Sequence, residues 1–341
     1  MPRFRKASNI RAGVIGYGGA YDVGHAHITW IRTTGMTPVC VVDTDPNRLE
    51  IAAREFPEIE RYSSVTEMLK KSDVHLLTVG TPHNTHAPLA VQCLRAGRHV
   101  ITEKPFAVTT TECDRMIDEA RKRRLVITTH HNRHWDSSIL IARQVIEKGA
   151  IGQIIGIEAH IASHAKPRDW WRSSKSASGG ALYDWGVHVL EWALQLIDSK
   201  IVEVSGFATR GTWAPPSGWR NDLIEDEGRV VVRFKSGQWL SMCVSSIDTA
   251  PQREGFIIRG TQGTHLLGPA TTICKKGNAM VATNHRLPPR RWEMSYKNLV
   301  DHLTRGVPLI ITPQWARRPV HILDLAYRSA RLGRSLKAKY G

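Results

Sequence analysis

The first 130 or so residues repeat one pattern, in which a short run of β-branched residues is followed by a turn and then by a helical pattern. The predicted strands are residues 11–15, 37–42, 74–79, 99–102 and 126–129. The predicted helices are residues 24–33, 46–55, 65–70, 85–96 and 109–123. Strands that alternate with helices form a parallel sheet with helices on its faces. This half of the chain is therefore predicted to be a doubly wound α/β domain.

Longer strand patterns begin near residue 154 and replace this alternation. They span residues 154–163, 201–211, 229–234, 238–247 and 255–260, and turn signals join them. This pattern favours an open, mostly antiparallel sheet with one face packed and the other free or paired with a second subunit. Helical periodicity returns at residues 292–305 and 314–339. The predicted domains are residues 1–130, an α+β domain over 131–312, and a helix over 313–341 that packs back on the first domain.

Composition excludes several classes of protein. Lys and Arg number 47 against 31 Asp and Glu, which gives a net charge of +16. Such an excess raises nucleic acid or an anionic ligand as partners, but the tight basic cluster at residues 121–124 lies at a predicted helix end, where cations are favourable. We therefore predict a solvated basic surface and no nucleic-acid partner. No apolar run is long enough to span a membrane, no signal peptide follows the basic start, and the five cysteines are dispersed. These features predict a cytoplasmic protein.

An apolar segment over residues 179–197 carries its ionisable side chains on one helical face. Asp184, His188, Glu191 and Gln195 follow one another at steps of four, three and four residues. A helix that is apolar on its other faces is buried, and burying a carboxylate near an imidazole is costly unless they are hydrogen-bonded. The segment therefore predicts a buried helix beside a cavity with chemistry in it.

A glycine-rich loop follows the first predicted strand. It contains Gly16, Tyr17, Gly18 and Gly19, and it predicts a tight turn whose backbone amides approach a pyrophosphate at the next helix. Asp43, at the end of the second strand, is placed to accept hydrogen bonds from ribose hydroxyls, which favours NAD over NADP. The alternatives are that the glycines only form a turn and that Asp43 only caps the following helix.

Further motifs stand at the ends of later strands. They are Thr81-Pro82-His83-Asn84-Thr85-His86, Glu103-Lys104-Pro105, Asn132-Arg133 and Trp171-Arg172. Together with the glycine loop and the Asp184/His188 helix, they resemble the glucose-fructose oxidoreductase, inositol dehydrogenase and rhizopine-catabolism family (Gfo/Idh/MocA). The resemblance implies a Rossmann domain, an open antiparallel sheet, NAD(P)-dependent redox chemistry on sugars or cyclitols, and homodimers or homotetramers that pair their sheets.

The resemblance also assigns roles to individual residues. Lys104 looks like the family's active-site lysine, Asp184 like the carboxylate that assists it, and His188 like the proton-transferring imidazole. Positions that match the family's cofactor site are Thr81, Pro82, His86, Glu103, Lys104, Asn132, Trp171 and Arg172. Two departures stand out: an insertion at residues 20–23 lengthens the glycine loop, with Tyr21 in the place of the third glycine, and His130-His131 replace smaller or apolar residues.

The three residues that the resemblance places in the active site suit the chemistry of an alcohol dehydrogenase. An imidazole such as His188 titrates near neutrality and can remove the hydroxyl proton. Lys104 would stabilise the developing alkoxide, and Asp184 would orient the imidazole or pair with Lys104. The alternatives are a buried polar pair that only fixes helix packing and a surface lysine at a strand end. Glu191 and Gln195 are predicted to be structural or interfacial.

Substrate contacts are predicted for Lys104, His131, Trp170, Arg172, Asp184 and His188. Tryptophan faces stack on sugar rings, whereas Arg168, Arg172 or Lys175 could read a carboxylate or phosphate. No metal site is predicted, because paired Cys spacing and His-Glu-x-x-His are absent from the sequence.

Three functions remain open at this point. The first is an NAD(P)-dependent oxidoreductase that acts on a hydroxyl or ketone of a sugar or cyclitol. The second is an enzyme that cleaves or epimerises glycosides with transient use of tightly bound NAD. The third is a cofactor-binding sensor without catalysis. Nucleotide that co-purifies would support the second, and salt-dependent DNA binding without turnover would support the third.

Overall fold

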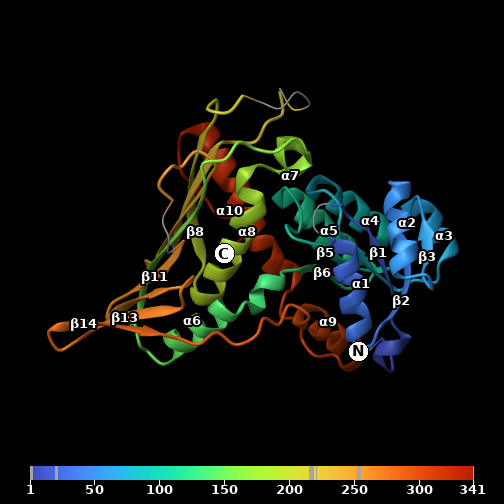
Figure 1. The fold of residues 1–341 in the computed structure, drawn as a ribbon, viewed down its shortest axis with the longest axis horizontal. Coiled ribbons are helices and arrows are strands. Elements are labelled where there is room, and N and C mark those ends of the chain that lie inside the picture. The colour runs from blue at the N-terminus through green and yellow to red at the C-terminus, as the bar shows by residue number, and fades with distance from the viewer. Residues whose placement is uncertain (1–2, 20–21, 215–218, 220, 252–254, 341) are drawn as a thin grey trace. The chain divides into compact units, whose positions relative to one another are not determined.

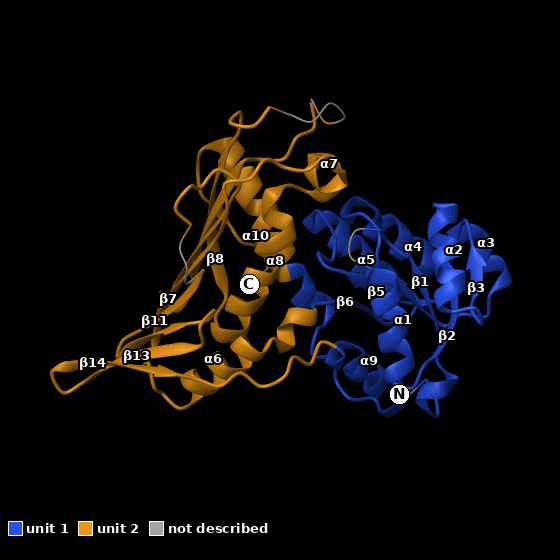
Figure 2. Ribbon diagram, in the orientation of Figure 1, with its two compact units in different colours: residues 1–131, 293–317 blue, residues 132–292, 318–341 orange. Residues whose placement is uncertain are grey.

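The computed structural model describes residues 3–19, 22–214, 219, 221–251 and 255–340. The chain divides into two compact units, shown in Figure 2. Unit 1 comprises residues 1–131 and 293–317, and unit 2 comprises residues 132–292 and 318–341. The predicted loop insertion at residues 20–23 falls partly outside the described residues, because residues 20 and 21, including Tyr21, are not described.

Unit 1 is built on a parallel sheet of six strands (Figure 1). The strands are β1 (Arg11–Ile15), β2 (Thr37–Val42), β3 (Glu60–Tyr62), β4 (Leu76–Val79), β5 (His99–Glu103) and β6 (Ile127–His130). Their order, β3-β2-β1-β4-β5-β6, reverses between β1 and β4. Ligands of such sheets bind at the carboxyl ends of the strands beside this reversal. The predicted doubly wound Rossmann domain is confirmed.

Three of the first five helices of unit 1 begin at a side-chain cap. The five helices are α1 (Val23–Thr33), α2 (Pro46–Glu55), α3 (Val65–Lys71), α4 (His86–Arg95) and α5 (Thr110–Lys122), with short 3₁₀ turns η1 (Ala7–Asn9) and η2 (His83–Thr85). Asp45 caps α2 through Asn47 N, Ser64 caps α3, and Thr109 forms a capping box with Glu112. Strand β3 was not predicted, because Glu60 and Arg61 are exposed and carry no alternating pattern.

Helix α9 (Met294–Arg305) belongs to unit 1 rather than to the second domain. Tyr296, Leu299 and Leu303 are buried in the same apolar cluster as Ile10 and Ile28 of the Rossmann domain. The compact units therefore divide the chain differently from the predicted boundary at residue 312, because the amphipathic face of α9 completes the core of unit 1.

Unit 2 is built on a nine-stranded sheet. Its strands are β7 (Ile154–Ala162), β8 (Ile201–Thr209), β9 (Glu227–Phe234), β10 (Trp239–Ser245), β11 (Phe256–Gly260), β12 (Gly263–Leu266), β13 (Thr271–Lys276), β14 (Ala279–Asn284) and β15 (Leu336–Lys337). The order is β14-β13-β12-β11-β7-β10-β9-β8-β15, in which β7 and β10 pair in parallel and the other neighbours are antiparallel. The predicted open, mostly antiparallel sheet is confirmed. Strands β12 to β15 and helix α6 (Ser137–Glu147) were not predicted.

Two long helices run along one face of this sheet (Figure 1): α8 (Ala181–Leu196) and α10 (Pro313–Leu332). Gly186 of α8 allows close packing, since a Cβ there would lie 2.9 Å from Met242 Cε of β10. The short elements η3 (Asn132–Trp135), η4 (Trp171–Ser173) and α7 (Lys175–Ser178) complete the unit. Among the described residues, no helix is both long and apolar enough to cross a membrane.

The C-terminal helix does not pack back on the Rossmann domain along its whole length as predicted. Its first residues, Pro313–Arg317, belong to unit 1, where Arg317 Nη1 donates to Asp114 Oδ1 at 2.7 Å. The rest belongs to unit 2, where Tyr327 OH accepts a hydrogen bond from Leu182 N at 3.0 Å. The first residues of α10 thus make a polar contact within unit 1, and the rest of the helix makes one within unit 2.

Candidate functional site

The glycine loop after β1 has the conformation that a dinucleotide site requires. Gly16 and Gly18 have φ values of +90° and +80°, which L side chains rarely adopt. A Cβ at Gly16 would lie 2.8 Å from Gly80 O at the end of β4. Gly24 takes the packing role of the missing third glycine, because a Cβ there would lie 2.5 Å from Tyr17 Cα.

The carboxylate of Asp43 is fixed against the same loop. Its Oδ2 accepts hydrogen bonds from Tyr17 N at 2.8 Å and Gly18 N at 3.4 Å, and its Oδ1 accepts one from Asp45 N at 2.9 Å. Asp45, rather than Asp43, caps α2. The side chain of Tyr17 is buried and its hydroxyl donates to Glu55 Oε2, so Tyr17 meets Asp43 through its backbone.

Arg48 is a residue of this region that the sequence did not single out. A Cβ at Gly19 would lie 2.4 Å from Arg48 Nη2, so the guanidinium lies directly over the loop. Its Nε is 3.9 Å from Asp45 Oδ2. In sequence, Arg48 looks like an ordinary solvated cation in the first turn of a helix, and nothing local signals its contact with Gly19.

Two turns at the carboxyl end of the sheet are tied together by His86. Its Nδ1 lies 2.8 Å from Pro105 O and its Nε2 lies 2.9 Å from Thr81 O. Burial lowers the pKa of this imidazole. Thr81 follows β4 with Pro82, and its Oγ1 lies 2.5 Å from Thr85 Oγ1. His86 is buried and thus joins the two turns from inside the protein.

The Glu103-Lys104-Pro105 segment ends strand β5 with a cis peptide bond between Lys104 and Pro105. Lys104 is half-buried, and its backbone N donates to Glu103 Oε2 at 3.0 Å. The other carboxylate oxygen, Oε1, lies 3.2 Å from His27 Nε2 of α1. Burial would raise the pKa of Glu103, but the contact with His27 and the charge of Lys104 hold it below its usual range.

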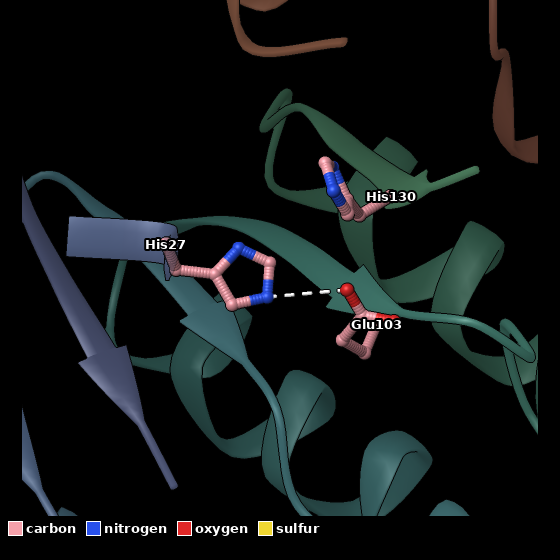
Figure 3. Close-up of side chains that lie close together, drawn as sticks. All are labelled: His27, Glu103 and His130. Atoms are coloured by element: carbon pink, nitrogen blue, oxygen red, sulfur yellow. Dashed lines mark ion pairs between the residues drawn. The ribbon is translucent and has the colours of Figure 1, made fainter. Parts of the chain in front are cut away.

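Strand β6 brings His130 to the same place (Figure 3). Nitrogen and oxygen ligand atoms of His27, Glu103 and His130 all lie within 4.8 Å of one another. Burial lowers the pKa of His130. His27 could have been found from the sequence, because it falls on the same helical stripe as Gly24, Ile28 and Ile31, which are buried.

The predicted residues after β6 lie on both sides of the unit boundary. His131 is fully buried at the end of unit 1. Asn132 opens η3 in unit 2 and its Oδ1 accepts a hydrogen bond from Arg133 N at 3.0 Å. Two residues on, His134 Nδ1 lies 2.5 Å from Glu191 Oε1 of α8. Glu191 is thus part of a buried polar pair that packs η3 on α8.

Helix α8 places Asp184 and His188 one turn apart, as predicted. Asp184 accepts a hydrogen bond from Arg172 Nη1 at 3.2 Å. The guanidinium carbon of Arg172 lies 5.1 Å from the ring centroid of Trp170 and 5.0 Å from that of Trp171. His188 is buried. The structure therefore gathers Trp170, Trp171, Arg172 and Asp184 within unit 2.

Two side chains that were predicted to bind an anionic group of the substrate form ion pairs with carboxylates of the protein. Arg172 is paired with Asp184, and Lys175 Nζ lies 2.9 Å from Glu225 Oε1. Arg210 pairs with the same Glu225. Burial lowers the pKa of Lys175 to about 8. Their charges are therefore compensated inside the protein.

The structure brings the predicted residues together in three groups. Gly16, Tyr17, Gly18, Asp43 and Thr81 form one group around the glycine loop of unit 1. Pro82, His86, Glu103 and Lys104 stand on the neighbouring strand ends of the same unit. Asp184, with its Arg172 and tryptophan neighbours, and His188 form the third group in unit 2.

Comparison with known proteins gives matches over both halves of the chain. A model described as "Oxidoreductase family, NAD-binding Rossmann fold" matches residues 10–131, and one described as "GFO/IDH/MocA C-terminal domain" matches residues 139–265. The uncharacterized oxidoreductase YdgJ of Escherichia coli is 26% identical over 84% of this chain and 78% of its own length. The scyllo-inositol 2-dehydrogenase (NADP(+)) IolW of Bacillus subtilis is 26% identical over 56% of this chain and 53% of its own length.

A solved structure also shares the fold. The WlbA dehydrogenase from Bordetella pertussis, in complex with NADH and UDP-GlcNAcA, superposes with a TM-score of 0.81. The match covers 97% of this chain and 99% of the other at 22% identity.

Proposed function

The chain belongs to the Gfo/Idh/MocA family of NAD-binding oxidoreductases, and we propose that it transfers hydride between nicotinamide and a secondary hydroxyl or ketone of a sugar, a sugar derivative or a cyclitol. The observation that carries the proposal is the family match over both halves of a chain that holds Lys104, Asp184 and His188. The inositol and UDP-sugar named for two of the similar proteins support the same substrate class.

The three residues divide the proton chemistry between them. His188 takes the hydroxyl proton when the substrate is oxidised, and it returns a proton when the ketone is reduced. The ammonium of Lys104 donates to the same substrate oxygen and stabilises the developing alkoxide. Asp184, held by Arg172, supplies a negative charge one helical turn before His188 that orients its imidazole. The nicotinamide, when bound, accepts the hydride or gives it back.

We propose NAD rather than NADP as the cofactor. The glycine loop fits a dinucleotide, because Gly16 and Gly18 leave their backbone uncovered at positive φ beside the start of α1. Asp43 Oδ1 accepts only the N–H of Asp45 and keeps a second lone pair for a ribose hydroxyl. The negative charge at this position disfavours a 2′-phosphate.

A homodimer or homotetramer through the sheet of unit 2 is also proposed. Strands β7 to β9 carry large apolar side chains at the surface, namely Ile155 (47% exposed), Val202 (40%), Phe207 (62%) and Val231 (37%). Exposed apolar patches of this kind mark interaction surfaces. Light scattering after size-exclusion chromatography tests this, and a monomeric mass at micromolar concentration would refute it.

The activity is tested by mixing the purified protein with NAD or NADP and a panel of monosaccharides, disaccharides, sugar derivatives and inositols, while following absorbance at 340 nm. Turnover with one class of polyol is expected, and it should be faster with NAD. Silence across the panel, from protein that binds NAD, would overturn the proposal. Turnover without added NAD, with nucleotide released on denaturation, would instead indicate transient use of a retained cofactor.

A further inference from the structure

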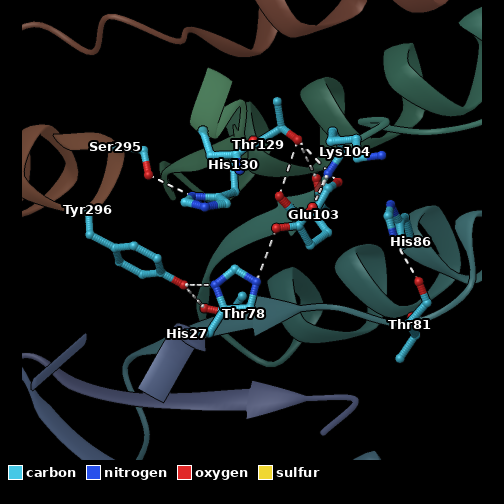
Figure 4. Close-up of polar contacts among 12 residues, drawn as sticks. His27, Thr78, Thr81, His86, Glu103, Lys104, Thr129, His130, Ser295 and Tyr296 are labelled. Atoms are coloured by element: carbon cyan, nitrogen blue, oxygen red, sulfur yellow. Dashed lines mark hydrogen bonds and ion pairs between the residues drawn. The ribbon is translucent and has the colours of Figure 1, made fainter. Parts of the chain in front are cut away.

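Three side chains of unit 1 converge from separate elements on one small space. His27 comes from α1, Glu103 from the end of β5 and His130 from the end of β6 (Figures 3 and 4). The residues His27 and His130 are 0% and 1% exposed, and the side chain of Glu103 is 20% exposed. Two imidazoles and one carboxylate are the ligand set that zinc and its neighbours in the first transition series prefer.

A hydrogen-bond partner at Nδ1 fixes the orientation of each imidazole. His27 Nδ1 lies 2.9 Å from Tyr296 OH, which in turn lies 2.7 Å from Thr78 Oγ1. His130 Nδ1 lies 2.6 Å from Ser295 Oγ. A histidine that binds a metal through Nε2 usually donates its Nδ1–H to such an outer partner. Both rings therefore turn Nε2 toward the shared space.

Both of these nitrogens are buried and make no hydrogen bond within the described part of the structure. Glu103 Oε1 and His27 Nε2 are 3.2 Å apart, whereas Glu103 Oε2 is engaged with Lys104 N. A buried, unsatisfied ring nitrogen costs free energy unless something accepts or binds it.

We infer that His27 Nε2, Glu103 Oε1 and His130 Nε2 form a binding site for a divalent transition-metal ion such as Zn²⁺. Ligand atoms around a tetrahedral zinc lie about 3.4 Å apart, so the 3.2 Å between His27 and Glu103 already fits. All three ligand atoms lie within 4.8 Å of one another. Rotation of the imidazole rings that shortens the longest of these distances by on the order of 1 Å brings the atoms to tetrahedral spacing. Three protein ligands leave a fourth position for water.

The sequence predicted no metal site, because it has no local pairing of His or Cys that resembles a zinc motif. The three ligands lie on three different elements, so only the fold brings them together. The ion neutralises the partly buried Glu103 carboxylate, and through the bond from Lys104 N to Glu103 Oε2 it holds the turn that carries Lys104. The inference does not depend on the proposed substrate, since metal binding is measured without turnover.

The test uses the full chain without an affinity tag, stripped by a chelator and titrated with Zn²⁺ at micromolar protein. About one equivalent should bind. The ligand variant His130→Ala should bind at least about 100-fold more weakly. The matched control is His25→Gln, two residues from His27 on the same helix, whose side chain is 48% exposed and pairs with Glu55. It should bind as the wild type does.

Two further measurements keep the inference decidable if His130→Ala does not fold. Ser295→Ala removes the outer partner of His130 without removing a ligand, and it should weaken Zn²⁺ binding about 10-fold to 100-fold. Co²⁺ added to the wild type should give visible d–d bands of a four- or five-coordinate site. Failure of the wild type to bind near-stoichiometric Zn²⁺ would overturn the inference. Equal affinity in His130→Ala, or in Ser295→Ala where His130→Ala is unfolded, would overturn it as well.

Discussion

Arg172 Nη1 donates a hydrogen bond to Asp184 Oδ2 at 3.2 Å, while its guanidinium lies over the rings of Trp170 and Trp171. A guanidinium that stacks and hydrogen-bonds at once is held in one orientation, which a flexible ammonium could not reproduce. The carboxylate on the first turn of α8 therefore has a defined partner from a segment that precedes the helix.

Replacing Arg172 with Gln should lower kcat/KM about 10-fold to 100-fold, because a charged hydrogen bond to Asp184 contributes about 1.5–3 kcal/mol. Arg172→Lys should recover only part of this loss. Steady-state kinetics with the best substrate of the panel measures both. The exposed Arg143 of α6, whose Nη2 lies 4.0 Å from Glu147 Oε1, gives the matched control Arg143→Gln. Activity of Arg172→Gln equal to that control would show that the pair has no part in the reaction.

Removing the proposed acid–base groups should separate chemistry from cofactor binding. Lys104→Met and His188→Gln should each lower kcat by about 10²-fold to 10⁴-fold, the usual contribution of a positioned proton donor or acceptor. Calorimetric titration with NAD should give nearly unchanged affinity for His188→Gln. Lys122→Met changes an exposed lysine at the end of α5 and should keep full activity. Full activity in either active-site variant would exclude that residue from catalysis.

Asp43→Asn should weaken NAD binding and reduce its preference over NADP. The amide keeps the shape of the side chain but removes the charge and one of the two carboxylate oxygens, of which Oδ2 now accepts from Tyr17 N and Oδ1 from Asp45 N. A loss of about 1.4 kcal/mol, which is tenfold in affinity, is expected for NAD. Asp45→Asn, which alters the neighbouring helix cap, should leave the ratio of NAD to NADP affinity unchanged. An unaltered ratio in Asp43→Asn would mean that Asp43 only supports the loop.

The sequence predicted the elements of unit 1 well because buried parallel strands and capped helices leave strong local patterns. Strands β1 and β2 and helix α2 have the predicted bounds. The Asp184/His188 face could be predicted for the same reason, since the few polar residues of an otherwise apolar helix are recognisable in the sequence by their helical spacing.

The contacts that join distant segments could not be predicted in this way. Arg48 over Gly19, Arg172 on Asp184, and the meeting of His27 with His130 depend on how separate elements pack. Periodicity describes one element at a time, so it places a side chain on a face without saying what faces it. The role of Gly24 was missed similarly, because its contact with Tyr17 depends on where the longer loop returns.

His99 should make the protein sensitive to acid. It is buried, accepts a hydrogen bond from Val126 N at Nδ1 (2.9 Å), and burial lowers its pKa to about 3. The unfolded chain binds this proton near pH 6.5 and the folded chain does not, so the stability it contributes is present above pH 6.5. It is lost as the pH falls from there toward 3, by about 1.4 kcal/mol per pH unit.

Urea unfolding at pH 7, 6 and 5 measures this dependence. His99→Gln should be less stable at pH 7. Its free energy of unfolding should fall less steeply on acidification than that of the wild type, by the slope that the binding of one proton contributes. The exposed His164 provides the control His164→Gln, which should keep the wild-type slope. The same slope in His99→Gln as in the wild type would contradict the assignment.

The buried pair of Glu191 and His134 should be a main determinant of the stability of unit 2. Glu191 is 1% exposed, its Oε1 lies 2.5 Å from His134 Nδ1, and its Oε2 accepts a hydrogen bond from Gln195 Nε2 at 2.8 Å. Glu191→Ala leaves a buried imidazole without this partner and should cost about 3 kcal/mol or more. Gln195→Ala removes one hydrogen bond from the same carboxylate and should cost about 1 kcal/mol. Urea unfolding followed by tryptophan fluorescence compares the two, and equal costs would show that the pair contributes no more than a single hydrogen bond.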